Sequence, residues 1–254
     1  MAVSRPLWRE FPDRRNHRKI VIADRQAYVG GVNIANRYLY HWRDVCLRVQ
    51  GRSVAEFERV FAEDWMRASG QRCERGQGSA PRGDVRVVAE GVESAVVECV
   101  GGARRCVLLS TPYFVPPPEV ERALTERVTQ GVEVAVLIPD VCDSRVVGAV
   151  AEEYIARVVA RGVRVWRYTA GFNHAKTLVT DDVAMVGSAN FDYRSLRRNR
   201  EIMTLFGGRA AEHLERDFRH ALSRSVEVRR SHPSRQGALD RLIRLLATPL
   251  HPLL

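Results

Sequence analysis

A nine-residue pattern occurs twice in this chain and constrains its fold more than any other feature. NHRKIVIAD begins at Asn16 and NHAKTLVTD begins at Asn173, so both copies read N-H-x-K-x-x-x-x-D at an offset of 157 residues. The same offset relates Gly30–Gly31 to Gly187–Ser188. One H-x-K match is weak evidence, because an isolated histidine is commonly structural. Two gapless copies indicate an internal repeat.

The only two lysines of the chain, Lys19 and Lys176, lie inside these motifs, although lysine and arginine together number 40. Two positions that keep lysine indicate a role that a guanidinium cannot fill, such as a compact charge on a phosphate oxygen. The formal net charge of +10 favours polyanionic partners, namely nucleic acid, anionic lipid headgroups or phosphate-bearing substrates. The alternative is a solvated basic surface without a specific partner.

Each motif predicts two adjacent strands. Apolar runs at 19–23 and 176–180 are each followed by a turn and a second run, at 27–30 and 183–186. Alternate residues of a strand face the same side, so the histidine and the lysine of each motif share one face.

An α/β unit precedes the second motif and is missing before the first. Strands and helices are expected to alternate there as β-α-β-α-β, at 106–110, 118–130, 133–138, 144–161 and 163–168. This order implies parallel strands covered by helices. The first motif has only 16 residues before its histidine, so roughly 70 residues of the expected unit are absent by repeat logic.

The chain is therefore interpreted as one and a half repeats. An incomplete N-terminal repeat spans 1–68, a linker rich in Gly, Ser and Arg spans 69–84, and a complete C-terminal repeat spans 85–254. A helix is expected over 53–68, with Phe61 on its buried face. Since 45% of the residues are hydrophobic, the chain is long and apolar enough to bury a substantial core.

Further motifs extend the pattern. Residues 187–201 read G-S-x-N-x-D-x-R-S-x3-N-x-E, residues 111–116 read TPYFVP, and the chain ends in RLIRLLATPLHPLL. With the paired H-x-K motifs, they resemble the phospholipase D superfamily, and more closely its bacterial cardiolipin synthase branch, over residues 16–254. The resemblance implies an α/β phospholipase D-like fold, a mixed β-sheet flanked by helices with two pseudo-symmetric repeats. Compared with that branch, most of the first repeat and any preceding membrane helices are absent.

Transfer at a phosphodiester needs a nucleophile, a proton donor and cations over the phosphoryl oxygens. His17 and His174 can fill the first two roles if one ring is neutral and the other protonated. Lys19 and Lys176 supply the positive charge. The resemblance implies a covalent phosphohistidine, and assigns the nucleophile to the N-terminal motif, hence to His17, with His174 as acid and base.

Other polar residues complete the expected site. The candidates are Asn33, Ser188 and Asn190 as donors to the phosphate, Asp44 and Glu201 as carboxylates that orient the histidines, and Asp24 and Asp181 as residues at strand turns that organise the site. Each orienting carboxylate follows the histidine of its own copy by 27 residues. An ordinary surface ion pair is the alternative for Asp44. The five cysteines show no metal-binding or disulfide spacing, and no metal or cofactor is expected.

The resemblance implies that two phosphatidylglycerol molecules are converted to cardiolipin with release of glycerol. Three alternatives remain: hydrolysis of a phospholipid, cleavage of nucleic acid, which is the less expected partner, and an inactive remnant that only binds anionic lipid. A homodimer is one route by which the incomplete repeat could be compensated.

The leucine-rich segment 239–254, with Arg241 and Arg244, suits either an anionic membrane surface or a helix packed on the core. No apolar run is long enough to span a bilayer. We therefore expect a peripheral protein on the cytoplasmic face of the membrane.

Overall fold

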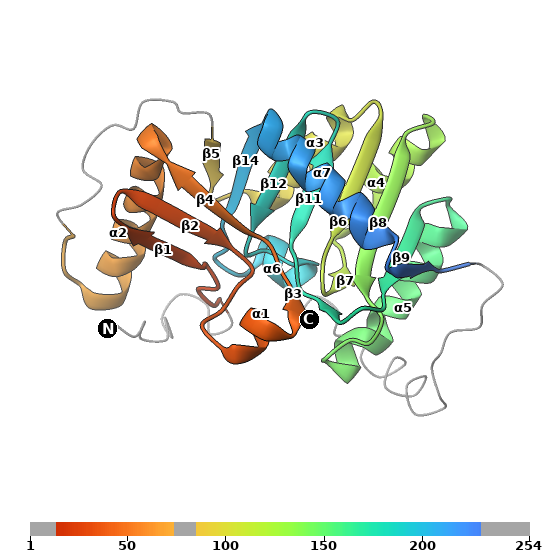
Figure 1. Ribbon diagram of the computed structural model, residues 1–254, viewed down its shortest axis with the longest axis horizontal. Coiled ribbons are helices and arrows are strands. Elements are labelled where there is room, and N and C mark those ends of the chain that lie inside the picture. Colours follow the sequence, from red (N-terminus) through yellow and green to blue (C-terminus); the bar gives the residue numbers. More distant parts are fainter. Residues whose placement is uncertain (1–13, 74–84, 230–254) are drawn as a thin grey trace.

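An eight-stranded mixed sheet forms the centre of the molecule (Figure 1). The structure is a computed structural model and describes residues 14–73 and 85–229. Across the sheet the strands are β15 (Ser225–Glu227), β9 (Arg164–Tyr168), β8 (Glu133–Pro139), β6 (Cys106–Ser110), β11 (Thr177–Thr180), β12 (Val183–Gly187), β14 (Met203–Gly207) and β5 (Val85–Val88). Strands β6, β8 and β9 are parallel, and every other neighbouring pair is antiparallel.

Helices cover both faces of this sheet, and strand alternation explains how. On one face lie α3 (Val92–Gly102), α4 (Pro118–Thr129) and α5 (Arg145–Ala160), and on the other lies α7 (Arg209–Leu222). Successive side chains of a strand point to opposite faces. In β6, Leu109 therefore packs in the core under α3–α5, whereas Leu108 packs in the core under α7.

A smaller antiparallel sheet lies beside the large one. It contains β1 (Ile20–Ala23), β2 (Gln26–Gly30) and β4 (Cys46–Gln50), and α2 (Val54–Ser69) covers it. Ile202, from the C-terminal repeat, is buried in the core of this sheet, so the two repeats share apolar contacts. The predicted burial of Phe61 is wrong. Its side chain is 40% exposed and stacks on Trp65 on the outer face of the helix.

Four elements of the N-terminal repeat recur in the C-terminal repeat at the same sequence offset. The corresponding pairs are β1 and β11, β2 and β12, β4 and β14, and the short helices α1 (Asn36–Tyr40) and α6 (Tyr193–Arg197), each pair separated by 157 residues. The register agrees as well, because Gly30 pairs with Cys46 and Gly187 pairs with Met203. The predicted mixed sheet with two pseudo-symmetric repeats is confirmed.

Several elements were not anticipated from the sequence, and α3, β5 and β14 are those that belong to or cover the large sheet's far edge. The division into repeats at 1–68, 69–84 and 85–254 stays a prediction, and 74–84 lies outside the described residues, as does the leucine-rich segment 239–254. Within the described part of the chain, no helix combines the length and the apolar character needed to cross a bilayer.

Candidate active site

Short backbone pairings bring the two motifs together. The two-residue strands β3 (Trp42–Arg43) and β10 (Phe172–Asn173) are parallel partners, and the His174 N–H donates to the Arg43 carbonyl at 2.7 Å. At the equivalent place the His17 N–H donates to the Arg200 carbonyl at 2.9 Å. Each motif is thus fixed to the other copy of the repeat, immediately at its histidine.

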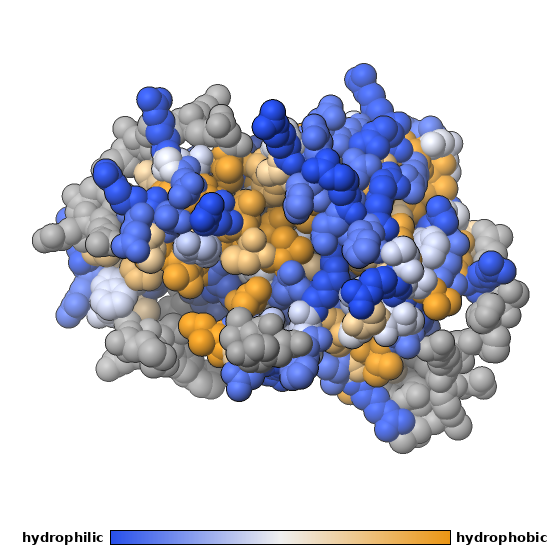
Figure 2. All heavy atoms as spheres, in the orientation of Figure 1, coloured by the Kyte–Doolittle hydropathy of each residue, from blue (hydrophilic) through white to orange (hydrophobic). Residues whose placement is uncertain are grey.

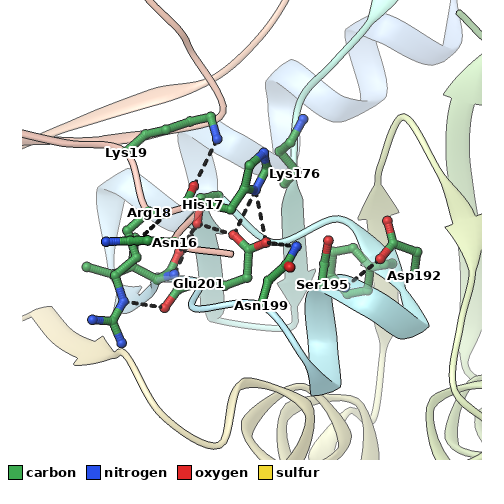
Figure 3. A network of polar contacts seen from close by, with 12 residues as sticks. Asn16, His17, Arg18, Lys19, Lys176, Asp192, Ser195, Asn199 and Glu201 are labelled. Carbon is green, nitrogen blue, oxygen red and sulfur yellow. Dashed lines mark hydrogen bonds and ion pairs between the residues drawn. The ribbon is translucent and has the colours of Figure 1, made fainter. Parts of the chain in front are cut away.

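The carboxylates are exchanged between the repeats. Glu201 lies 2.9 Å from Nδ1 of His17, and Asp44 lies 2.7 Å from Nδ1 of His174 (Figure 3 shows the first pair). The side chains of both carboxylates are almost fully buried. A buried carboxylate at Nδ1 fixes the tautomer of the ring and leaves Nε2 for chemistry. The 27-residue spacing identified the two carboxylates but not which histidine each one contacts.

The two lysines occupy equivalent places. Lys19 Nζ donates to the His17 carbonyl at 2.9 Å, and Lys176 Nζ donates to the His174 carbonyl at 2.6 Å. Desolvation lowers the pKa of Lys176 to about 7, although attraction to Asp44 raises it. Desolvation also lowers the pKa of Lys19 to about 8, against attraction to Glu201 and Asp44. The charge of both ammonium groups can therefore respond to a bound anion near neutral pH.

The two histidines have different surroundings. The side chain of His17 is 36% exposed, and its described ring contacts are made through Nδ1. The side chain of His174 is only 10% exposed, and Lys176 Nζ lies 2.8 Å from its Nε2. Desolvation lowers the pKa of His174, while the hydrogen bond with Asp44 opposes this shift.

The three expected phosphate donors have unequal environments. Ser188 is fully buried; its hydroxyl donates to Glu201 at 2.5 Å and accepts from the Ile202 N–H. Asn190 is buried, and its Oδ1 has no hydrogen-bond partner in the described structure. Asn33 is exposed and donates to the Tyr38 hydroxyl at 2.6 Å. Ser188 thus holds a carboxylate, while Asn190 carries an unused polar group.

Asp24 and Asp181 do not join this cluster. Asp181 follows β11, so it lies about 17 Å along the strand from Lys176 at ~3.3 Å per residue. Both aspartates take left-handed backbone conformations, with φ of 50° and 49°, which aspartate tolerates better than most residues. Burial raises the pKa of Asp181, but hydrogen bonds from the backbone N–H groups of residues 104–106 outweigh this and lower it. In the second copy, Asp181 therefore forms the turn after β11, and its carboxylate accepts hydrogen bonds from the backbone at the start of β6.

Glycines make room for the carboxylate contacts. A Cβ atom on Gly187 would overlap the Ile202 carbonyl, and one on Gly31 would lie 2.5 Å from the Asp44 carboxylate. Ser188 replaces Gly31 in the second copy, where the longer Glu201 accepts its hydroxyl instead. In the second copy a hydroxyl therefore binds the carboxylate, where the first copy has only the space that a glycine leaves.

Aromatic side chains around His174 were not identified from the sequence. The ring centroids of Tyr38 and Trp42 each lie 5.0 Å from that of His174, and Phe172 lies at 6.2 Å. The Arg37 guanidinium lies 5.0 Å from the centre of the Trp42 ring. The repeat contained a signal that could have identified them. At the offset of 157 residues, each of these three aromatic positions corresponds to a polar residue in the other repeat.

Comparisons with known proteins fit this geometry. Residues 96–222 match the family described as "Cardiolipin synthase, PLD-like domain". The chain belongs to this family, within the phospholipase D superfamily. Among its relatives, cardiolipin synthase A of Pseudomonas aeruginosa is 37% identical over 92% of this chain, and cardiolipin synthase 2 of Bacillus cereus is 30% identical over 98%. The chain spans 52% and 53% of these two proteins, about half of their length. The predicted family is confirmed.

Solved structures of the superfamily share the fold. Phosphatidylserine synthase of Haemophilus influenzae aligns with a TM-score of 0.71 at 14% identity, covering 94% of this chain and 70% of that chain. Nuc of Salmonella typhimurium, a phospholipase D family member, aligns with a TM-score of 0.50 at 20% identity, covering 57% of this chain and 96% of that one. At these identities the likeness concerns the fold alone.

Proposed function

We propose that this chain carries the catalytic centre of a phosphatidyltransferase that makes cardiolipin from two phosphatidylglycerol molecules and releases glycerol. One observation carries the proposal. Two histidines, each held by a buried carboxylate of the other repeat, lie with two lysines in a single cluster built by one chain. The names of the relatives supply the substrate class. Because both motifs come from one chain, this centre does not require a homodimer.

In the first half-reaction, His17 is the nucleophile. Its Nδ1 is engaged by Glu201, so the Nε2 lone pair attacks phosphorus. A nitrogen–phosphorus bond forms and the bond to the glycerol oxygen breaks. His174 gives that oxygen a proton, and the lysine ammonium groups neutralise the phosphoryl oxygens. The greater exposure of the His17 ring supports this assignment of roles.

In the second half-reaction the roles reverse. His174, now neutral, takes the proton of the glycerol hydroxyl on a second phosphatidylglycerol, and that oxygen attacks phosphorus. The phosphorus–nitrogen bond breaks, and His17 is regenerated. Burial lowers the pKa of His174, so its ring readily gives up the proton that it must donate first and recover later. No net proton is gained or lost over the cycle.

The proposed substrate places the reaction at a membrane surface, and we assign it to the cytoplasmic face. The formal net charge of +10 supports attraction to anionic lipid. Water in place of the second lipid would give phosphatidic acid, and a nucleic-acid strand in place of the first lipid would make the protein a nuclease.

The test is to incubate the purified 254-residue chain with phosphatidylglycerol in mixed micelles and to follow products by mass spectrometry. Cardiolipin and glycerol in equal amounts are the expected result, together with a phosphatidyl adduct on His17 after rapid quenching. If phosphatidic acid is the only lipid product, the protein is a hydrolase and not a transferase. A folded chain that forms neither product, or that cleaves only plasmid DNA in a parallel assay, would overturn the proposal.

A further inference from the structure

The two halves of the active site differ in a systematic way that the repeat makes visible. Three aromatic residues stand around His174, and the 157-residue offset gives the position that corresponds to each one beside His17. The pairs are Tyr38 with Ser195, Trp42 with Asn199, and Phe172 with Arg15. Every aromatic residue on one side therefore has a polar counterpart on the other.

The aromatic side is partly open. Tyr38, Trp42 and Phe172 are half-buried, and they pack on one another and on the His174 ring. The ring centroids of Trp42 and Phe172 are 4.4 Å apart, and those of Tyr38 and Trp42 are 4.7 Å apart. The exposed parts of these rings thus form one continuous apolar surface that begins at His174.

The opposite side carries polar residues at the corresponding positions of the repeat. Asn199 donates to Glu201 at 3.3 Å, and Ser195 is buried beside the Asp192 carboxylate, to which its N–H donates. Figure 3 shows Asn199 and Glu201 together at His17, with Ser195 and Asp192 farther along the same side. A polar alcohol finds hydrogen-bonding groups here, and an acyl chain does not.

An exposed aliphatic residue precedes the aromatic residues in the chain. Ile34, four residues before Tyr38, has a relative exposure of 101%, whereas its repeat counterpart Phe191 is fully buried. Asn33 donates a hydrogen bond to the Tyr38 hydroxyl, which connects the loop that carries Ile34 to the first of the aromatic residues. Figure 2 shows a small group of apolar side chains near the lower left edge of the molecule, close to where Figure 1 draws the loop before α1.

A cation accompanies this apolar edge. The Arg37 guanidinium lies over the rings of both Tyr38 and Trp42, at 5.6 and 5.0 Å from their centres, and the residue is exposed. The exposed Ile34 side chain, the partly exposed aromatic rings and the Arg37 cation over these rings are the kinds of group that favour the boundary between the headgroups and the acyl chains of an anionic membrane.

We propose that Ile34, Tyr38, Trp42 and Phe172, named here the aromatic wall, bind the glycerol ester and proximal acyl chains of a membrane phospholipid. Ile34 enters the bilayer surface, and the side with Ser195 and Asn199 receives the polar alcohol. The part of this proposal that concerns catalysis rests on the proposed function. The part that concerns lipid binding does not.

The test measures binding and turnover separately. Variants Ile34→Ser and Trp42→Phe are compared with Val226→Ser, a matched control on the edge strand β15, where Val226 is 54% exposed. Binding is measured by co-sedimentation with phosphatidylglycerol vesicles and by quenching of tryptophan fluorescence with brominated acyl chains. Turnover is measured as the ratio of kcat/KM for long-chain phosphatidylglycerol to that for its chain-free analogue, glycerophosphoglycerol.

We expect Ile34→Ser to weaken vesicle binding and to lower the kcat/KM ratio by at least about fivefold, mainly through KM. We expect Trp42→Phe to remove most of the fluorescence quenching, and Val226→Ser to behave like wild type. Equal effects of Ile34→Ser and Val226→Ser, or quenching that persists without Trp42, would overturn the aromatic wall. Vesicle binding that depends on Ile34 in a protein without any turnover would retain the wall and reject the proposed function.

Discussion

At the scale of single residues, the buried carboxylates Asp44 and Glu201 each contact the histidine of the other repeat. Their equal spacing from the two histidines identified them as carboxylates of the site. The spacing did not predict that each carboxylate contacts the histidine of the other repeat, because distance along the sequence does not tell which segments lie together in space. The exchange depends on the pairing of β3 with β10, two strands of two residues each, too short to leave a periodic signal.

The exchange predicts which histidine responds to which carboxylate. The hydrogen bond that the His174 ring makes to Asp44 raises the pKa of His174, so Asp44→Asn should lower the pKa of His174 further. Glu201→Gln, which changes the carboxylate of the same repeat as His174, is the control and should have the smaller effect on that pKa. NMR titration of the His174 imidazole resonances in both variants measures the difference. A larger effect of Glu201→Gln than of Asp44→Asn would contradict the exchanged pairing.

Lys176 offers a second prediction at this scale. It is fully buried, and its Nζ contacts both ring nitrogens and the carbonyl of His174. Arginine carries the same charge, but its planar fork cannot occupy the position of a compact ammonium group. We expect Lys176→Arg to reduce kcat by at least about 100-fold.

The chain itself provides a control for this substitution. Arg122→Lys exchanges the same two residue types on the exposed surface of α4 and should leave kcat unchanged. Circular dichroism separates a loss of fold from a loss of chemistry. Full activity of a folded Lys176→Arg protein would show that confinement of the two lysines to the motifs has no chemical meaning.

At the scale of elements, the strand pairs of both motifs were predictable because their alternation and turns are local. The helix α3 was not, since its residues VESAVVECVGG include four valines and two terminal glycines, which have weak helix propensity. Burial of Val96 and Val100 against the large sheet stabilises it instead. Strand β5, with four residues, is likewise defined by pairing with β14 rather than by its own sequence.

Gly187 permits a prediction about how β12 meets the segment before β14. A Cβ there would overlap the Ile202 carbonyl and approach the backbone of Met203, so the strand would have to move. We expect Gly187→Ala to destabilise the fold by about 1–3 kcal/mol, and to disturb Ser188 and hence Glu201. Gly101→Ala in α3, where a Cβ meets nothing within 4 Å, is the control and should be neutral or stabilising. Urea unfolding compares them, and equal midpoints would contradict the overlap.

At the scale of the whole molecule, the pseudo-symmetry concentrates charge at the boundary between the repeats. Lys19, Lys176, Asp44 and Glu201 interact electrostatically across that boundary, where burial removes them from water. One repeat alone would supply one histidine and one carboxylate. These two would not contact each other, because each carboxylate binds the histidine of the other repeat. The site therefore exists only where both repeats are present. Burying its charged groups lowers the free energy of unfolding of the whole fold.

That cost should appear as a dependence of stability on pH. The pKa of Lys176 is about 7 in the folded protein and ~10.4 in an unfolded chain. Between these values the unfolded state holds more protons, so Lys176 makes the free energy of unfolding rise with pH, by up to about 1.4 kcal/mol per pH unit. Below pH 7 the lysine is protonated in both states and contributes no slope.

Lys176→Met removes this contribution while retaining an unbranched side chain. Urea unfolding of both proteins at pH 6, 7, 8 and 9 measures it, because the other titrating groups largely cancel in the difference between the two curves. We expect wild type to gain stability relative to the variant as pH rises above 7, and the difference to be constant below that value. Parallel curves throughout would mean that Lys176 keeps its proton in the folded state, and that its neighbouring carboxylates fully compensate for its burial.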